Sequence, residues 1–507
     1  MSDRRRPIAE GVLFTDLYQL TMAQLYWKRG LHERPVQFDY FFRRYPDYGE
    51  HRAGYAVFAG MGWLLDWMED LWFTDPDLAA LRAQGRFDEG FLRWLGSGEG
   101  FSTIEIRSVP EGRVIHANAP AAIVTGPLAV AQILETSLLN HLNYQTLVAT
   151  KASRVDEAAR GNSVLEFGLR RGPDVGANAG ARAALIGGAD FTSNVGVSSM
   201  LGLDPKGTHA HSMIQLFIAL GYGEVDAFRA YAEIYPDDCV LLVDTVDTLE
   251  SGIPNAITVF NELRSTGHAP AGVRLDSGDL AYLAVQAARM LDAAGFDGVA
   301  IVLSSDLDEL AIWQVLTQID IEAPRYGVDP RALASRLVYG VGTRLITSHG
   351  SPSLDGVYKL VAVDDGTWLP AIKISDTPEK IPIPGRKRLW RVYDERGLAT
   401  ADVVSGIDEQ LAAGQPFTIH HPHRDGISRS LSGPAVGSVE ELLVPVLSMG
   451  RRLDGNPSIH QLRLWRRADL ERLDAGVRRI IDPVEYHVSV TTAVRDLQRE
   501  LVARTRS

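Results

Sequence analysis

The sequence is poor in cysteine: Cys239 is the single one among 507 residues. A lone cysteine excludes a disulfide within the chain and a zinc site made of cysteine thiolates. Since disulfides are frequent in exported proteins, this scarcity indicates a cytoplasmic protein. The sequence also lacks a run of about 18 apolar residues, so we expect no transmembrane helix and no membrane partner. The basic first residues are not followed by an apolar segment of signal-peptide length.

An excess of positive charge is absent as well. The chain has 51 basic and 64 acidic residues and a net charge of -13. Because a nucleic-acid surface needs a basic face, we expect no nucleic-acid partner. An anionic substrate is still compatible with this balance, since a few arginines can dominate one pocket. The hydrophobic share of 45% and the charged share of 23% are typical of a globular protein with room for more than one core.

The pattern of the chain changes near residues 160 and 350. We therefore expect an N-terminal α/β domain in 1–160, a barrel domain in 161–350, and a C-terminal segment in 351–507 that partly returns to the N-terminal domain. The expected elements of the two outer segments are a helix in 14–30 capped by Thr15 or Asp16, a strand in 36–46, short strands in 105–127, one or two helices in 128–160, an antiparallel hairpin turning at 364–366, further strands in 386–450 and a final helix.

The middle segment alternates short apolar runs with helical stretches. The runs are Ser163–Gly168, Leu185–Asp190, the approach to Gly207–His211, Cys239–Asp244, Gly272–Asp276, Val299–Ser305 and Leu337–Thr343. Such alternation predicts a parallel sheet with right-handed crossovers. We expect an irregular TIM-like α/β barrel, joined to a discontinuous α/β (α+β) domain made from the N-terminal and C-terminal segments. An open doubly wound sheet is the alternative.

Polar residues follow the expected strands, and the active sites of parallel barrels lie at the carboxyl ends of their strands. The residues at these ends are Arg170, Arg171, Asp190, Ser193, Thr208, His211, Asp244, Arg274, Asp276, Ser304, Asp306, Gly342 and Thr343. Arginine suits a two-pronged grip on carboxylate or phosphate. Gly340–Thr343 is similar to a turn that cradles phosphate. Any one aspartate here can simply cap a helix, and Asp279 is expected to do so.

The segment Gly207–Ser212, GTHAHS, carries two histidines two positions apart. A metal site there lacks a third ligand at a fixed spacing, so we expect no direct metal ligation by the protein. A histidine that acts as nucleophile or general base is the other interpretation.

Nine ordered segments give the chain a resemblance to a known family. They are LFTDLYQLTMAQ, FDYFFRRYP, LEFGLRRG, GGADFTSNV, GTHAHS, VDTVDTLESGIPNAI, GVRLDSGDLAYLA, SSDLDE and YGVGTRLITS. In this order, from about residue 11 to 390, they resemble nicotinate phosphoribosyltransferase. The resemblance implies transfer of phosphoribosyl from phosphoribosyl pyrophosphate to nicotinate, coupled to ATP hydrolysis, with Mg²⁺. It also implies a role in NAD synthesis and a homodimer whose active site lies at the interface.

The resemblance assigns roles residue by residue. His211 corresponds to the histidine that ATP phosphorylates, and His209 occupies a variable position. Asp276 is expected to bind ribose hydroxyls or Mg²⁺-bound water, and Thr208 is expected to contact a substrate. Tyr18 corresponds to the tyrosine that stacks on the pyridine ring, and Arg274 to the arginine that faces the nicotinate carboxylate, with Arg170 and Arg171 in the same anion-binding region. Gly342 and Thr343 correspond to the turn that binds the 5′-phosphate. Ser304, from the strand ends, completes the expected substrate-binding set.

These groups suit the reaction that the resemblance implies. Phosphoribosyl transfer passes through an oxocarbenium-like state, so the protein mainly positions its substrates and stabilises charge. Nicotinamide phosphoribosyltransferase is the nearest alternative, and it needs an acceptor for the amide. Quinolinate phosphoribosyltransferase is a shorter family without the ATP-linked histidine motif. A third reading, a non-catalytic nucleotide-binding barrel, predicts the loss of some strand-end residues.

Overall fold

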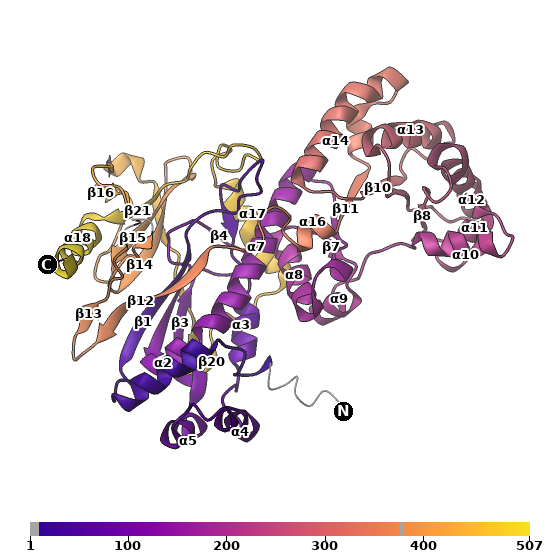
Figure 1. Ribbon diagram of the computed structural model, residues 1–507. Coiled ribbons are helices and arrows are strands. Elements are labelled where there is room, and N and C mark those ends of the chain that lie inside the picture. The colour runs from indigo at the N-terminus through magenta and orange to yellow at the C-terminus, as the bar shows by residue number, and fades with distance from the viewer. Residues whose placement is uncertain (1–9, 376, 378–379, 507) are drawn as a thin grey trace. The chain divides into compact units, whose positions relative to one another are not determined.

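The computed structural model describes residues 10–375, 377 and 380–506 (Figure 1). Its contacts divide the chain into two compact units. The first unit combines the residues up to Thr150 with those from Ser353 onward, and the second comprises Lys151–Pro352. The first boundary falls inside the 25-residue helix α7 (Glu135–Ala159).

The main sheet of the first unit contains strands from both ends of the chain. Its order is β13-β12-β1-β5-β3-β19-β20. The strands are β1 (Pro35–Phe42), β3 (Glu105–Ser108), β5 (Ala122–Pro127), β12 (Gly356–Asp364), β13 (Trp368–Pro370), β19 (Val444–Ser448) and β20 (Arg451–Arg452). The aromatic and β-branched β1 pairs antiparallel with β5 on one side and with β12 on the other. The strand expected in 36–46 and the hairpin turning at 364–366 are confirmed.

A second sheet of this unit is formed mainly by the C-terminal segment. Its order is β17-β16-β21-β15-β14-β18, and β2 pairs separately with β4. These strands are β2 (Ala56–Val57), β4 (Val114–Ile115), β14 (Lys387–Tyr393), β15 (Ala399–Gly406), β16 (Phe417–His420), β17 (Ser428–Leu431), β18 (Ser438–Glu441) and β21 (Val488–Thr491). The helices are α2 (Leu17–Lys28), α3 (Met61–Met68), α4 (Asp75–Ala83), α5 (Glu89–Ser97), α6 (Leu128–Ile133), α17 (Ile459–Glu471) and α18 (Thr492–Arg506).

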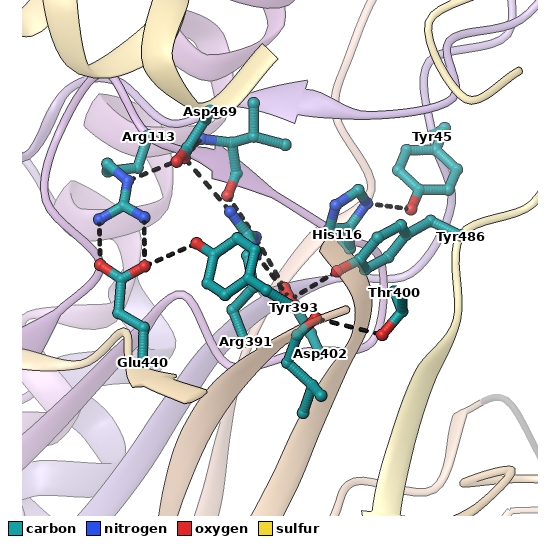
Figure 2. A network of polar contacts seen from close by, with 12 residues as sticks. Tyr45, Arg113, His116, Arg391, Tyr393, Thr400, Asp402, Glu440, Asp469 and Tyr486 are labelled. Atoms are coloured by element: carbon teal, nitrogen blue, oxygen red, sulfur yellow. Dashed lines mark hydrogen bonds and ion pairs between the residues drawn. The ribbon is translucent and has the colours of Figure 1, made fainter. Parts of the chain in front are cut away.

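A buried polar network joins the two ends of the chain inside this unit (Figure 2). Arg391 on β14 is 1% exposed, and its guanidinium donates to both carboxylate oxygens of Asp402 at 2.8 Å. It also donates to Asp469 at 3.2 Å. From the N-terminal segment, Arg113 donates to the same oxygen of Asp469 at 2.8 Å and to both carboxylate oxygens of Glu440 at 2.8 and 3.0 Å. Paired charges of this kind fix the relative orientation of the segments that carry them.

The second unit is built on a six-stranded parallel sheet with the order β7-β6-β11-β10-β9-β8. The strands are β6 (Val164–Glu166), β7 (Phe191–Thr192), β8 (Val240–Leu242), β9 (Gly272–Leu275), β10 (Ala300–Ser304) and β11 (Leu337–Val341). The helices are α8 (Asp174–Gly187), α9 (Val195–Leu201), α10 (His211–Ala219), α11 (Glu224–Ile234), α12 (Ile253–Ser265), α13 (Leu280–Ala293), α14 (Glu309–Glu322), α15 (Pro330–Ala334) and α16 (Thr343–Ile346).

The parallel sheet is confirmed, whereas the closed barrel is not. The first strand of this unit, β6, pairs with the last, β11, as in a barrel wall. Within the described ranges no pairing joins β7 to β8, so the sheet keeps two edges there. The segment that carries GTHAHS, in 203–210, lies in the chain between these edge strands and forms no strand.

Two of the expected strands of the second unit are wrong. Leu185–Gly187 is the buried end of α8, because a short apolar run fits a buried helix as well as a strand. The approach to GTHAHS contains Pro205 and Gly207, which disfavour a strand, and it has no regular secondary structure. Asp190 also lies elsewhere than expected: it precedes β7 and accepts hydrogen bonds from Ser163 and the Val164 amide at 2.9 and 3.1 Å. It therefore lies at the amino-terminal end of the sheet.

Other predictions for the outer segments are confirmed. Helix α2 begins after Asp16, and the stretch 128–160 forms two helices, α6 and α7. The final helix is α18. In the part of the chain that is described, no helix has both the length and the apolar character needed to cross a bilayer.

Candidate active site

Arg274 is the centre of a polar cluster at the carboxyl ends of β9 and β10. It lies on β9, and its side chain is 13% exposed. Its Nε donates to Ser304 Oγ at 2.9 Å, its Nη1 to Thr208 Oγ1 at 3.1 Å and its Nη2 to Asp276 Oδ1 at 2.9 Å. Four of the residues predicted from the sequence therefore meet at one point. The parallel register of β9 and β10 explains this, because their carboxyl ends lie side by side.

Asp276 is held as a carboxylate by its neighbours. Burial alone would raise its pKa, but the hydrogen bond from Ser304 and the positive charge and hydrogen bond of Arg274 outweigh burial and lower it. The Ser304 hydroxyl donates to Asp276 Oδ1 at 2.5 Å. The side chain is 28% exposed, so a charged acceptor faces the space beside the cluster.

His211 is the first residue of α10 and lies next to this cluster. Its Nδ1 is 3.0 Å from Thr245 Oγ1. Its Nε2 lies 3.8 Å from Asp276 Oδ2 and 3.9 Å from Asp244 Oδ1. One ring nitrogen is thus occupied by a hydroxyl, while the other faces two carboxylates. The side chain is 39% exposed, which leaves it accessible to a ligand.

Asp244 follows β8, and its side chain is 1% exposed. Its Oδ2 accepts hydrogen bonds from the Asp276 amide at 3.2 Å and from Ser277 Oγ at 2.5 Å. Its Oδ1 has no hydrogen-bond partner among the residues that the structure describes. Sequence reasoning placed Asp244 at a strand end without giving it a role, and it missed Thr245 altogether. The only signal for Thr245 was its place next to Asp244, shortly after the apolar strand β8, and the sequence does not show which way its hydroxyl points.

His209 is held by a backbone hydrogen bond and by packing against an aromatic ring. Its Nε2 accepts a hydrogen bond from the Leu242 amide at 3.1 Å, and its ring packs edge-on against Tyr231 at 4.9 Å. Burial, with a smaller contribution from the charge of Arg274, lowers its pKa to about 4. His209 and His211 therefore have different surroundings. Within the described residues no group of three histidine, cysteine or acidic side chains is placed to hold a metal ion.

Gly342 and Thr343 form the turn that follows β11. A Cβ atom on Gly342 would lie 3.1 Å from the Phe167 carbonyl oxygen, and one on Gly340 would lie 2.6 Å from the Phe167 ring. Both glycines thus allow the β11 turn to pack closely on the end of β6. The same Phe167 ring lies 5.5 Å from the Arg274 guanidinium, which connects this turn to the cluster through one aromatic side chain.

Three predicted residues lie outside these contacts. Arg170 and Arg171 are exposed in the short 3₁₀ turn Leu169–Arg171 after β6, and no ion pair joins them to the Arg274 cluster within the described chain. Tyr18 belongs to α2 in the first unit and is 47% exposed. Partial burial, followed by the negative charges of Glu135 and Asp16, raises its pKa.

Comparison with known proteins decides the family. Residues 13–143 match the nicotinate phosphoribosyltransferase (NAPRTase) N-terminal domain, and residues 386–498 match the nicotinate phosphoribosyltransferase C-terminal domain. The chain is 40% identical over 482 residues to nicotinate phosphoribosyltransferase of Bacillus subtilis (strain 168), covering 94% of this chain and 92% of that protein. The chain belongs to the nicotinate phosphoribosyltransferase family.

Other members agree with this assignment. The nicotinate phosphoribosyltransferase of Homo sapiens is 32% identical over 547 residues, covering 97% of this chain and 96% of that protein. The crystal structure of human nicotinic acid phosphoribosyltransferase matches with a TM-score of 0.77 at 29% identity, over 96% of this chain and 99% of that one. Nicotinate-nucleotide pyrophosphorylase from Pyrococcus furiosus, at 21% identity and a TM-score of 0.66, shares the fold. These matches cover between 94% and 97% of the chain, so family membership applies to nearly its whole length.

Proposed function

We propose that this chain transfers the phosphoribosyl group of phosphoribosyl pyrophosphate to nicotinate, with coupling to ATP hydrolysis, in NAD synthesis. The products are nicotinate mononucleotide and pyrophosphate. The observation that carries the proposal is the cluster of Arg274, Asp276, Ser304 and Thr208 beside His211, at the strand ends where this fold places its chemistry. The family relationship supplies the substrates.

The cluster suits a reaction at an anomeric carbon. Arg274 offers a planar cation to the nicotinate carboxylate, and the pyridine nitrogen needs no deprotonation before it attacks. The attack forms the bond from nitrogen to the anomeric carbon as the bond to pyrophosphate breaks. In this proposal the carboxylate of Asp276 stabilises the positive charge that develops on the ribose.

The donor set also fits Mg²⁺. Asp276 and the buried Oδ1 of Asp244, which accepts no hydrogen bond from the residues that the structure describes, offer hard carboxylate oxygens, which Mg²⁺ prefers, commonly through its bound water. When bound, Mg²⁺ would neutralise charge on the leaving pyrophosphate. With no three-residue ligand group in the described chain, we propose contact through water molecules.

His211 is the proposed phosphate acceptor. With the Nδ1 proton donated to Thr245 Oγ1, the lone pair of Nε2 is free to attack the γ-phosphorus of ATP. The bond from phosphorus to nitrogen forms as the bond from phosphorus to the ADP oxygen breaks. The phosphoryl group would add negative charge beside Asp244 and Asp276, and hydrolysis of this group couples ATP to substrate binding.

We further propose a homodimer in the cytoplasm with the active site at the interface. The residues at the end of α10 and just after it expose apolar side chains, each between 44% and 65% exposed: Leu216, Ile218, Leu220 and Tyr222. Such a surface next to a site is typical of an interface. A partner chain that contributes Tyr18 would bring the aromatic ring that stacks on pyridine.

One assay tests the function. Purified protein is incubated with phosphoribosyl pyrophosphate and Mg²⁺, with nicotinate or nicotinamide, and with or without ATP. We expect nicotinate mononucleotide, a higher rate with ATP, and acid-labile phosphate on the protein that disappears in His211→Asn. A preference for nicotinamide would make the chain a nicotinamide enzyme, and no turnover of either base would favour a binding protein. ATP stimulation that persists in His211→Asn would remove the proposed role of that histidine.

A further inference from the structure

The loop between β10 and α14 has an unfavourable backbone conformation. Ser305 and Asp306, which follow Ser304, have φ values of +102° and +43°. Side chains disfavour this left-handed region, and such conformations persist only where the surrounding structure holds them. Ser304 itself bonds Arg274 and Asp276, so the position of the proposed active-site cluster depends on this loop.

Asp308, at the end of the loop, is 4% exposed and makes two contacts that hold it. Its Oδ1 accepts a hydrogen bond from the Ala311 amide at 3.0 Å, which caps α14. Its Oδ2 accepts a hydrogen bond from Arg344 Nη1 at 3.0 Å. Arg344 directly follows Thr343 in α16, the short helix that continues the turn after β11. One carboxylate therefore joins the loop after β10 to the turn after β11.

The next residue, Glu309, connects the loop between β10 and α14 to helix α7 through ion pairs. It is fully buried and lies 2.7 Å from Lys151 Nζ and 3.0 Å from Arg154 Nε, both on α7. Lys151 Nζ is also 4.0 Å from Asp308 Oδ2. Buried ion pairs are a poor source of net stability compared with apolar packing, so we interpret these pairs as fixing one arrangement of the segments that carry them. The charges here thus fit a positioning role.

We propose that Asp308 is a positioning residue, with Arg344 as its partner, that fixes the loop after β10 and the turn after β11 in a single arrangement. This inference rests on the proposed function for its kinetic consequence. The turn holds Gly342 and Thr343, which the family resemblance assigns to the 5′-phosphate, and the loop directly follows Ser304 of the cluster. When the ion pair is lost, the two halves of the site move independently, so binding of phosphoribosyl pyrophosphate weakens more than the chemical step.

The test uses two substitutions, one at each partner of the ion pair between Asp308 and Arg344. Asp308→Asn keeps an oxygen for the Ala311 amide, since asparagine caps helices as well as aspartate, but it removes the charge facing Arg344. Arg344→Gln removes the charge from a side chain that is 36% exposed, so this variant can be studied even if the first fails to fold. The matched controls are Glu262→Gln and Arg229→Gln, which break an exposed ion pair of 2.8 Å between α11 and α12.

The first measurement is hydrogen exchange of the backbone amides, and it is independent of activity. We expect each of the two variants to speed exchange severalfold in both 304–308 and 342–346, and the control variants to change neither segment. Acceleration confined to the segment that carries the substitution would overturn the proposal. A coupled exchange result in a protein that turns over no nicotinate would leave this inference standing and reject the proposed function.

The second measurement is kinetic. We expect the KM for phosphoribosyl pyrophosphate to rise about tenfold in either variant, with a much smaller change in kcat, and the double variant to be no worse than the singles. Arg344→Lys should recover part of the loss because it restores the charge. Additive losses in the double variant, or a fall in kcat at constant KM, would show that the pair does not act as a positioning unit.

Discussion

The Nδ1 atom of His211 lies 3.0 Å from the Oγ1 atom of Thr245, the residue that follows the buried Asp244. This contact joins the start of α10 to the end of β8. It sets the orientation of the imidazole, because the opposite nitrogen then faces Asp244 and Asp276. The reactivity proposed for His211 thus depends on a hydroxyl that sequence reasoning did not single out.

Thr245→Val tests this dependence. Valine has the shape of threonine but no hydroxyl, so the imidazole loses the hydrogen bond that orients it. A net hydrogen bond is worth about 1 kcal/mol, which predicts a fall of about three- to tenfold in the rate of ATP-supported synthesis. Thr245→Ser should retain most of the rate. Thr258→Val, at an exposed position of α12, is the matched control, and an equal fall in that variant would remove the assignment.

Arg274→Lys should impair nicotinate binding although it keeps the charge. Lysine cannot reproduce the three directed contacts that the guanidinium makes with Ser304, Thr208 and Asp276. We expect the KM for nicotinate to rise about ten- to a hundredfold, which corresponds to the free energy of one charged hydrogen bond or slightly more. Arg264→Lys, on the exposed end of α12, should have no effect. An unchanged KM in Arg274→Lys would assign nicotinate to another cation.

His209 should make the protein less stable at mildly acidic pH. Its folded pKa of about 4 lies below the ordinary 6.5, so the unfolded chain takes up the proton more readily. Its contribution to stability is complete above pH 6.5 and is lost as the pH falls from 6.5 towards 4. At pH 5 the loss in unfolding free energy is about 2 kcal/mol relative to pH 7.

Urea unfolding at pH 7 and pH 5 measures this loss. His209→Gln removes the titrating group and should shrink the difference between the two pH values by about that amount. His268→Gln, at an exposed position, should leave the difference as it is in the wild type. A His209→Gln protein that loses as much stability as the wild type on acidification would contradict the prediction.

Arg391→Met should destabilise the first unit strongly. The substitution leaves the carboxylate of Asp402 buried without its cation and removes one of the two arginines that pair with Asp469, at a cost of about 3–5 kcal/mol. Arg388→Met, on the same strand but 30% exposed at its side chain, should cost about 1 kcal/mol or less. Chemical denaturation of both variants provides the comparison, and similar losses would mean that the buried network contributes no more than a surface pair.

A shared active site predicts complementation between inactive variants. Tyr18→Ala and His211→Asn would damage different halves of each site if the tyrosine is supplied by the partner chain. Random mixing of the two unfolded and refolded variants then restores about a quarter of the sites. Sedimentation should show dimers in every sample. Activity no greater than the sum of the separate variants would place both residues in one chain's site.

The sequence predicted much of the fold because its patterns were local. The strand β1 and the hairpin of β12 and β13 follow from alternation and turn residues, and the parallel order of the second unit follows from alternating runs and helices. The errors came from runs without a distinctive period. Leu185–Gly187 is apolar because it ends a buried helix, and apolarity alone does not distinguish the two.

The site was partly predictable for a related reason. Arg274, Asp276 and Ser304 were found because strand ends converge in a parallel sheet, which needs no knowledge of side-chain directions. Thr208 and His211 were expected at the end of a strand that does not form, and it is the coil before α10 that brings them to the cluster. Contacts that depend on rotamers, such as that of Thr245, were not accessible. The cluster of Asp308, Glu309 and α7 was also missed, because it joins residues about 150 positions apart through burial.

The combination of strands from both chain ends in one sheet has a consequence for synthesis on the ribosome. The second unit is continuous from Lys151 to Pro352, so all its residues have emerged while the C-terminal strands are still being translated. The first unit cannot complete its sheet at that stage. One edge of β1 stays unpaired until β12 has been synthesised, and Arg113 lacks its partners Glu440 and Asp469 until the C-terminal segment has been synthesised. The segment made first therefore finishes folding last, and this interval is when the nascent chain is most exposed to mispairing.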